Sequence, residues 1–214
     1  MLVGRGALSF RCYAVSGKNA QPSDDKILEK LDAFAFTGLG AGEEGSVVGW
    51  VGPEHLFDGS FTADKVMRDP YAVFALRVDT RKVPGPLLAA HTAVEIAATL
   101  EAEGVDTISG ARKREIKQEV KRRLLAETPP SQRAYGVFWN VKGKRICLQT
   151  TSKTTNEHFR GFFERAFDLS LEPALPGLAA AAFAKEQGTL EALQEARPLS
   201  LAVKNKKRAT ASVA

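Results

Sequence analysis

The chain has 214 residues, of which 44% are hydrophobic and 26% are charged, a balance typical of a folded globular protein. No apolar run reaches the roughly 18–20 residues that a membrane-spanning helix needs. Arg5 and Arg11 lie within the apolar N-terminal stretch, which makes it a poor signal peptide. The formal net charge of +5 favours a polyanionic partner, and we expect a cytoplasmic protein without a membrane partner.

The N-terminal half alternates short strands with helices. Alternating apolar residues predict a strand over Leu8–Val15, and Ser23 or Asp24 caps a helix that runs to about Ala35. The Gly-rich loop Gly38–Gly45 lacks the Lys-Ser/Thr ending of a phosphate-binding loop. Strands are predicted over Ser46–Pro53 and Tyr71–Asp79, and a long helix follows Pro84 and Pro86 to about Glu103.

A strongly basic helix is predicted next, over about Ala111–Ala126. Ile116, Val120 and Leu124 recur every four residues and give it one apolar stripe. The stretch Gly110–Leu125 holds seven basic and two acidic residues, so positive charge is concentrated here. Pro129-Pro130 ends the helix.

The C-terminal half begins with a hairpin signal, in which Lys142-Gly143-Lys144 joins strands over Tyr135–Val141 and Arg145–Thr151. A capping box at Thr154 opens a helix whose phenylalanines we assign to the core, and Leu169–Leu175 is a further strand. Two short helices follow, in the Ala-rich stretch after Pro176 and over Thr189–Ala196. The order of elements predicts an α+β fold with a mixed, largely antiparallel sheet and packed helices.

The residues that carry chemistry in other proteins are scattered here. His55, His91 and His158 show no hydrolase or metal-ligand spacing, so we expect no catalytic residues, no metal site and no cofactor. Cys12 and Cys147 lie in apolar segments without zinc-ligand neighbours, and we expect two buried free thiols in a reducing compartment.

A succession of short motifs resembles the N-terminal and central part of the RdgC family of recombination-associated proteins. The resemblance covers roughly Leu8–Pro176 and is carried by motif order and spacing. The motifs are Ala33-Phe34-Ala35-Phe36-Thr37, Gly49-Trp50-Val51-x-Pro53, Arg81-Lys82-Val83-Pro84, a helix with Glu95, Lys117-x-Glu119-Val120 with Leu124-Leu125, and a strand containing Trp139.

The resemblance implies a function and an assembly. RdgC proteins bind double-stranded DNA without strong sequence preference, form a ring-shaped homodimer and restrain strand exchange by the RecA recombinase, with no attributed catalysis. The chain therefore resembles a shortened, nucleoid-associated member: an RdgC-like region over residues 1–176, an Ala-rich helical appendage over 177–202 and a disordered basic tail over 203–214. Ala126–Pro130 departs from the family's turn at a dimer contact, and members usually continue further, so we expect an open, concentration-dependent dimer.

The candidate DNA contacts follow from the charge pattern, because phosphate binding needs cations along a rigid element. Only Glu115 and Glu119 on the basic helix itself can balance its cations. The predicted contact residues are Arg112, Lys113, Arg114, Lys117, Lys121, Arg122 and Arg123, with Arg81 and Lys82 as secondary contacts. Three alternatives stay open: a solvated face, a protein-interaction or oligomerisation module for an acidic protein partner, and an RNA-binding surface, although the strands lack RNP-type aromatics.

Overall fold

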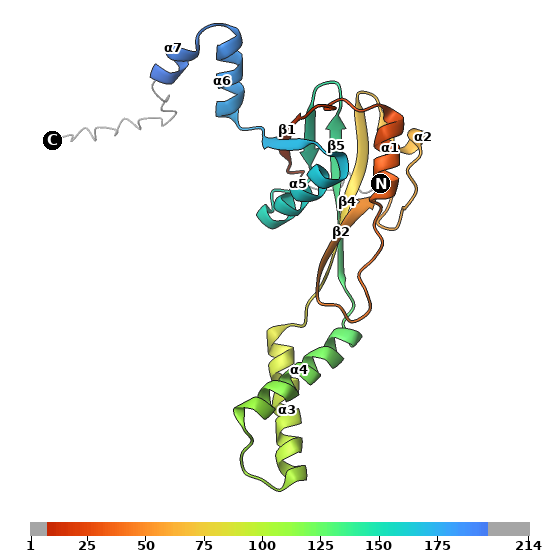
Figure 1. The fold of residues 1–214 in the computed structure, drawn as a ribbon, viewed down its shortest axis with the longest axis vertical. Helices are drawn as coiled ribbons and strands as arrows, with labels where there is room; N and C mark the ends of the chain where they lie inside the picture. Colours follow the sequence, from red (N-terminus) through yellow and green to blue (C-terminus); the bar gives the residue numbers. More distant parts are fainter. Residues whose placement is uncertain (1–7, 197–214) are drawn as a thin grey trace, which may run out of the picture. The chain divides into compact units, whose positions relative to one another are not determined.

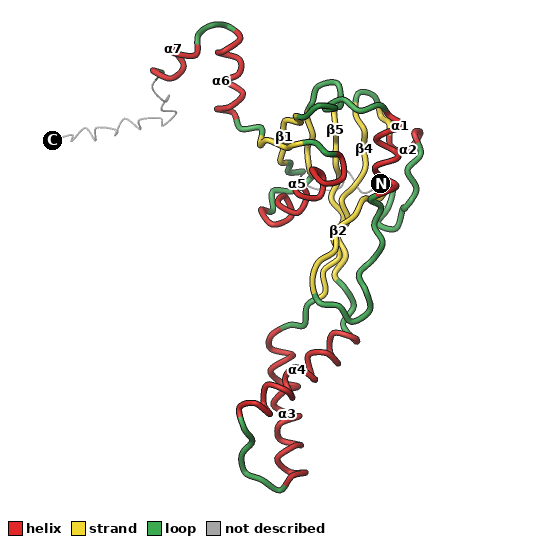
Figure 2. Tube along the Cα trace, in the orientation of Figure 1, coloured by secondary structure: helices red, strands yellow, loops and turns green. Residues whose placement is uncertain are grey.

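The computed structural model describes residues 8–196, and the chain divides after Pro173 into two compact units. The strands of the first unit are β1 (Arg11–Ser16), β2 (Gly45–Val51), β3 (Met67–Arg68), β4 (Tyr71–Arg81), β5 (Ser131–Asn140), β6 (Arg145–Leu148) and β7 (Ser170–Pro173). Its helices are α1 (Asp24–Ala33), α2 (Ala63–Val66), α3 (Gly85–Glu103), α4 (Gly110–Glu127) and α5 (Lys153–Phe167). Figure 1 labels most of these elements, and Figure 2 separates helices from strands by colour.

The strands form one sheet in the order β2-β4-β5-β6-β1-β7, with β3 added beside β4. Every strand pair is antiparallel, so the predicted α+β class with an antiparallel sheet is confirmed. β5 begins at Ser131 rather than at Tyr135, because it pairs with β4 as far as Thr80. The short elements α2 and β3 were not predicted, since so few residues carry no periodicity.

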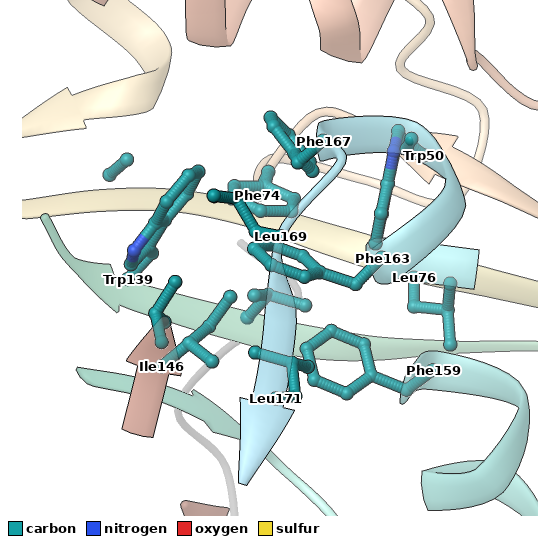
Figure 3. Packing of buried hydrophobic residues seen from close by; sticks show 14 of the residues in the cluster. Trp50, Phe74, Leu76, Trp139, Ile146, Phe159, Phe163, Phe167, Leu169 and Leu171 are labelled. Carbon is teal, nitrogen blue, oxygen red and sulfur yellow. The ribbon is translucent and has the colours of Figure 1, made fainter. Parts of the chain in front are cut away.

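The core of this unit lies between the sheet and helices α1 and α5. Phe163 and Phe167 lie between Trp50 of β2 and Trp139 of β5, with ring centroids 4.7 Å apart from each other and 5.2 and 5.1 Å from Trp139 (Figure 3). Phe34 at the end of α1 packs edge-on against Phe162 at 6.1 Å. The phenylalanines of α5 are therefore core residues, as expected.

The state of the two cysteines differs from the expected free thiols. Cys12 and Cys147 lie directly opposite each other on β1 and β6 and form a disulfide, with 4.0 Å between their Cα atoms. Each is half-buried, on the opposite face of β1 from Tyr13 and Val15, which enter the core. The prediction of two buried free thiols is wrong because 135 residues separate the pair in sequence, and only the sheet register brings them together.

A helical hairpin projects from the sheet between β4 and β5. In Figure 1 the lower ends of β2, β4 and β5 continue beyond α5 towards α3 and α4. The hairpin has its own small core, in which Val83 packs with the apolar stripe of α4. The basic helix is therefore held by a separate apolar cluster.

The second unit is described as far as Ala196 and contains α6 (Pro176–Glu186) and α7 (Leu190–Glu195). Gly188 takes a φ of 68° in the turn between them, a conformation that favours glycine. Both helices match the two short helices expected from the sequence. The basic tail predicted over 203–214 lies outside the described residues. Within residues 8–196, no helix is long and apolar enough to cross a membrane.

Candidate nucleic-acid interface

Helix α4 is fixed in place by its N-cap and its apolar stripe. The Ser109 hydroxyl accepts a hydrogen bond from the Arg112 backbone N–H at 3.1 Å, which satisfies one free donor of the first turn. Ile116, Val120 and Leu124 are buried, as the four-residue spacing predicted. Partly buried Leu88, Ile96 and Ile108 pack against this stripe, so the cationic side chains extend from a rigid element.

One side of α4, which we call the arginine flank (Arg112, Arg122 and Arg123), is largely neutralised by carboxylates. Arg123 lies 3.2 Å from Glu95 of α3, and Arg112 lies 3.2 Å from Glu115 and 4.0 Å from Glu103. These partners from α3 were not considered from the sequence, which counted only the acids of α4 itself.

Arg122 completes the arginine flank through an ion pair with Glu119. The hydrogen bond from Arg122 and its charge lower the pKa of the Glu119 carboxyl, and the same hydrogen bond with the charge of Glu119 raises the pKa of Arg122. Both side chains are exposed, so this pair adds little stability and can exchange for another anion.

The other side of α4 is the lysine flank (Lys113, Arg114, Lys117 and Lys121). Lys113, Lys117 and Lys121 recur every four residues and therefore follow one line along the helix. Within residues 8–196, Lys113, Arg114 and Lys117 have no carboxylate within ion-pair distance, and all three are exposed. Lys121 is the exception, since its Nζ lies 2.5 Å from an Oε2 of Glu44.

The structure separates the two secondary candidates at the end of β4. Arg81 is buried, and its Nη1 donates hydrogen bonds to the carbonyls of Gly40 at 2.6 Å and Glu43 at 3.4 Å. It therefore holds the Gly-rich loop, and its burial does not support the expected DNA contact. Lys82 is exposed beside it.

A polar cluster away from α4 surrounds Asp58, and its member Lys65 lines a cavity of about 520 Å³. Asp58 accepts hydrogen bonds from Ser60 and from Lys65, whose Nζ lies 3.2 Å away. Burial alone would raise the pKa of Asp58, but the hydrogen bonds from Ser60 and the charge of Lys65 together lower it. The described residues contain no group of three His, Cys, Asp or Glu side chains placed to hold a metal ion.

A comparison with models of known protein families shows the family to which the chain belongs. The family model with the description "Putative exonuclease, RdgC" matches residues 9–184, which include the whole sheet, the helical hairpin and nearly all of α6. The chain belongs to the RdgC family. The resemblance found in the sequence is thereby confirmed, and it associates this RdgC-family protein with DNA recombination and DNA binding in general terms. The word exonuclease in that description differs from the non-enzymatic expectation. No curated protein matches the chain.

Proposed function

We propose that this RdgC-family protein binds double-stranded DNA without sequence preference, through the lysine flank of α4. The observation that carries the proposal is the exposure of Lys113, Arg114 and Lys117 on a rigid helix without carboxylate partners among the described residues. Phosphates that take up such cations release condensed counterions, which drives binding at any sequence. Lys82, exposed at the end of β4, is a secondary contact.

The arginine flank has a supporting role in this proposal. Arg112, Arg122 and Arg123 are each roughly half or more exposed, at 50%, 76% and 49% of their side-chain surface. Ion pairs between exposed groups contribute about 0–1 kcal/mol, so DNA phosphates can replace the carboxylates. The arginine flank therefore contributes less binding free energy than the lysine flank, because the released carboxylates repel the DNA.

Family membership motivates the physiological part of the proposal. A protein that coats duplex DNA blocks the homologous partner from strand exchange, and we place this protein in the nucleoid of the cytoplasm, limiting strand exchange by a RecA-type recombinase. Strand-exchange assays with the purified protein test this step. The proposal requires inhibition that rises with coverage of the duplex, and inhibition by a variant that has lost DNA binding would contradict it.

A homodimer is part of the same proposal, and α3 supports it. This helix is mostly apolar, yet no residue in it is buried. Leu87 and Val94 are 41% and 69% exposed, and Ala90 and Ala97 lie on the same side by helical spacing. A second copy of the chain covers this face in our proposal, which gives a dimer without requiring a closed ring.

We also propose that the protein performs no catalysis. The polar cluster at Asp58 uses its Lys65 ammonium in hydrogen bonds to Asp58 and Ser60, so that group serves the fold of the loop. Incubation of end-labelled linear duplex with the protein and Mg²⁺ or Mn²⁺ tests this part. If a nucleotide-releasing activity co-purifies with the protein, the protein is an exonuclease instead.

The experiment for DNA binding is fluorescence anisotropy with a random-sequence duplex over a range of salt concentrations. The logarithm of the association constant should fall linearly with the logarithm of salt, with a slope that reports several neutralised phosphates. Binding without salt dependence, or no binding at about 50 mM salt, would overturn the proposal and favour an acidic protein as the partner of α4.

A further inference from the structure

A groove of mixed polar and apolar lining lies between α5 and the projecting part of the sheet. Two adjoining hollows of about 360 and 290 Å³ make it up, and both are lined by Ser46 and His158. The sheet contributes Arg133 and Tyr135 of β5, and α5 contributes Gly161 and Arg165.

The groove arises from the register of the sheet, because residues that pair across antiparallel strands share one face. The row Trp50–Leu76–Tyr135 passes beneath α5, where Trp50 and Leu76 are fully buried. The next two rows on this face line the hollows beside α5, where hydroxyl and arginine side chains join the apolar ones. They read Val48–Val78–Arg133 and Ser46–Thr80–Ser131.

The chemistry of the lining suits an anion. Arg133 and Arg165 are exposed, and neither forms an ion pair within the described part of the chain. The one carboxylate of the lining, Glu157, lies 3.9 Å from Lys153. Hydroxyl groups and arginine forks are the usual donors to phosphate oxygens in protein–DNA contacts.

Gly161 gives an independent indication. It lies in the middle of α5, where glycine weakens a helix relative to alanine. A Cβ at this position would meet no atom within 4 Å, so neither packing nor backbone conformation within the described chain requires a glycine. Its backbone lines the groove, which is the arrangement expected where a ligand approaches a helix closely.

We infer that this groove is a second binding site for the phosphate backbone of DNA, with Arg133 and Arg165 as its phosphate contacts. The inference rests on the proposed function, which it extends from one helix to a second surface of the same unit. An acidic protein segment is the competing occupant, and DNA is favoured because the lining combines hydroxyl groups with two exposed arginines that form no ion pair within the described residues.

The test measures the DNA affinity of the double variant Arg133→Ala, Arg165→Ala and of the wild-type chain by fluorescence anisotropy on a random-sequence duplex. Loss of two phosphate contacts should lower the slope of log K against log salt by about two and weaken binding, while the thermal midpoint stays unchanged. Lys26→Ala/Lys30→Ala on α1 removes the same charge from exposed positions outside the groove and should leave the slope nearly unchanged.

Gly161→Ala separates binding from folding. It should raise the thermal midpoint, since alanine favours the helix, and at the same time weaken DNA binding by obstructing the approach to the backbone. If the wild-type chain binds DNA and lysine-flank variants weaken it, but the double arginine variant and Gly161→Ala bind normally, the groove inference fails and the proposed function stands. If the wild-type chain binds no DNA, both fail.

Discussion

Lys121 and Glu44 form an ion pair with 2.5 Å between Nζ and Oε2, which connects the basic helix to the Gly-rich loop before β2. Arg81 holds the same loop through the Gly40 carbonyl. The carboxylate of Glu44 pairs with Lys121, a cation that a DNA phosphate would otherwise contact. The loop therefore competes with DNA for the lysine flank.

Glu44→Gln should therefore strengthen DNA binding. The change removes the competing charge and leaves Lys121 free, so the slope of log K against log salt should rise by about one. Salt-dependent anisotropy measures it, with Glu54→Gln, which removes an acid close to Lys65, as the control. Equal affinities for the wild-type chain and Glu44→Gln would mean that Lys121 makes no contact with DNA.

A substitution in the apolar stripe of α4 should lower the free energy of unfolding far more than one on its charged faces. Val120→Asp places a charge in a fully buried position and should lower the free energy of unfolding by about 3–5 kcal/mol. Lys117→Asp, on the same helix but exposed, should change it by about 0.5 kcal/mol or less. Urea unfolding followed by circular dichroism distinguishes the two, and equal stability of both variants would show that α4 does not pack on α3.

The disulfide should contribute to stability through its long loop. Replacing both Cys12 and Cys147 by serine should lower the free energy of unfolding by about 2–4 kcal/mol. Thermal unfolding of the wild-type chain with and without a thiol reductant checks the same effect without a mutation. A wild-type midpoint that does not respond to reductant, together with two free thiols by mass spectrometry, would contradict the pairing.

The exposed face of α3 should control self-association. Val94→Glu introduces a charge at the centre of that face and should shift the protein towards monomer without loss of helix content, because Val94 is 69% exposed. Light scattering over a range of concentrations measures the shift, and Glu101→Gln near the end of the helix is the control. An oligomeric state unaffected by Val94→Glu would assign the dimer contact elsewhere.

The sequence predicted those features that depend on local spacing. The repeat of Ile116, Val120 and Leu124 located the buried side of α4, and its four-residue period needs no knowledge of distant residues. The hairpin between β5 and β6 and the short helices after Pro176 followed from the same kind of signal.

The features that were missed depend on contacts between distant segments. Glu95 and Glu103 reach the arginine flank from α3, and Glu44 reaches Lys121 of the lysine flank from the Gly-rich loop. A helical pattern alone does not reveal these contacts. Arg81 was predicted to be a DNA contact because the sequence does not show that the Gly-rich loop folds against it. That contact joins residues far apart in the chain. The groove beside α5 likewise depends on the sheet register, which sets Arg133 opposite Val78.

The division of α4 into two flanks is the central claim, and a pair of charge-matched variants tests it most directly. One variant carries Lys113→Ala, Arg114→Ala and Lys117→Ala; the other carries Arg112→Ala, Arg122→Ala and Arg123→Ala. Anisotropy on a random-sequence duplex should show that the lysine-flank variant loses affinity and lowers the slope of log K against log salt by about three. The arginine-flank variant should lose clearly less, because its cations already have carboxylate partners. Equal losses in the two variants would contradict the claim.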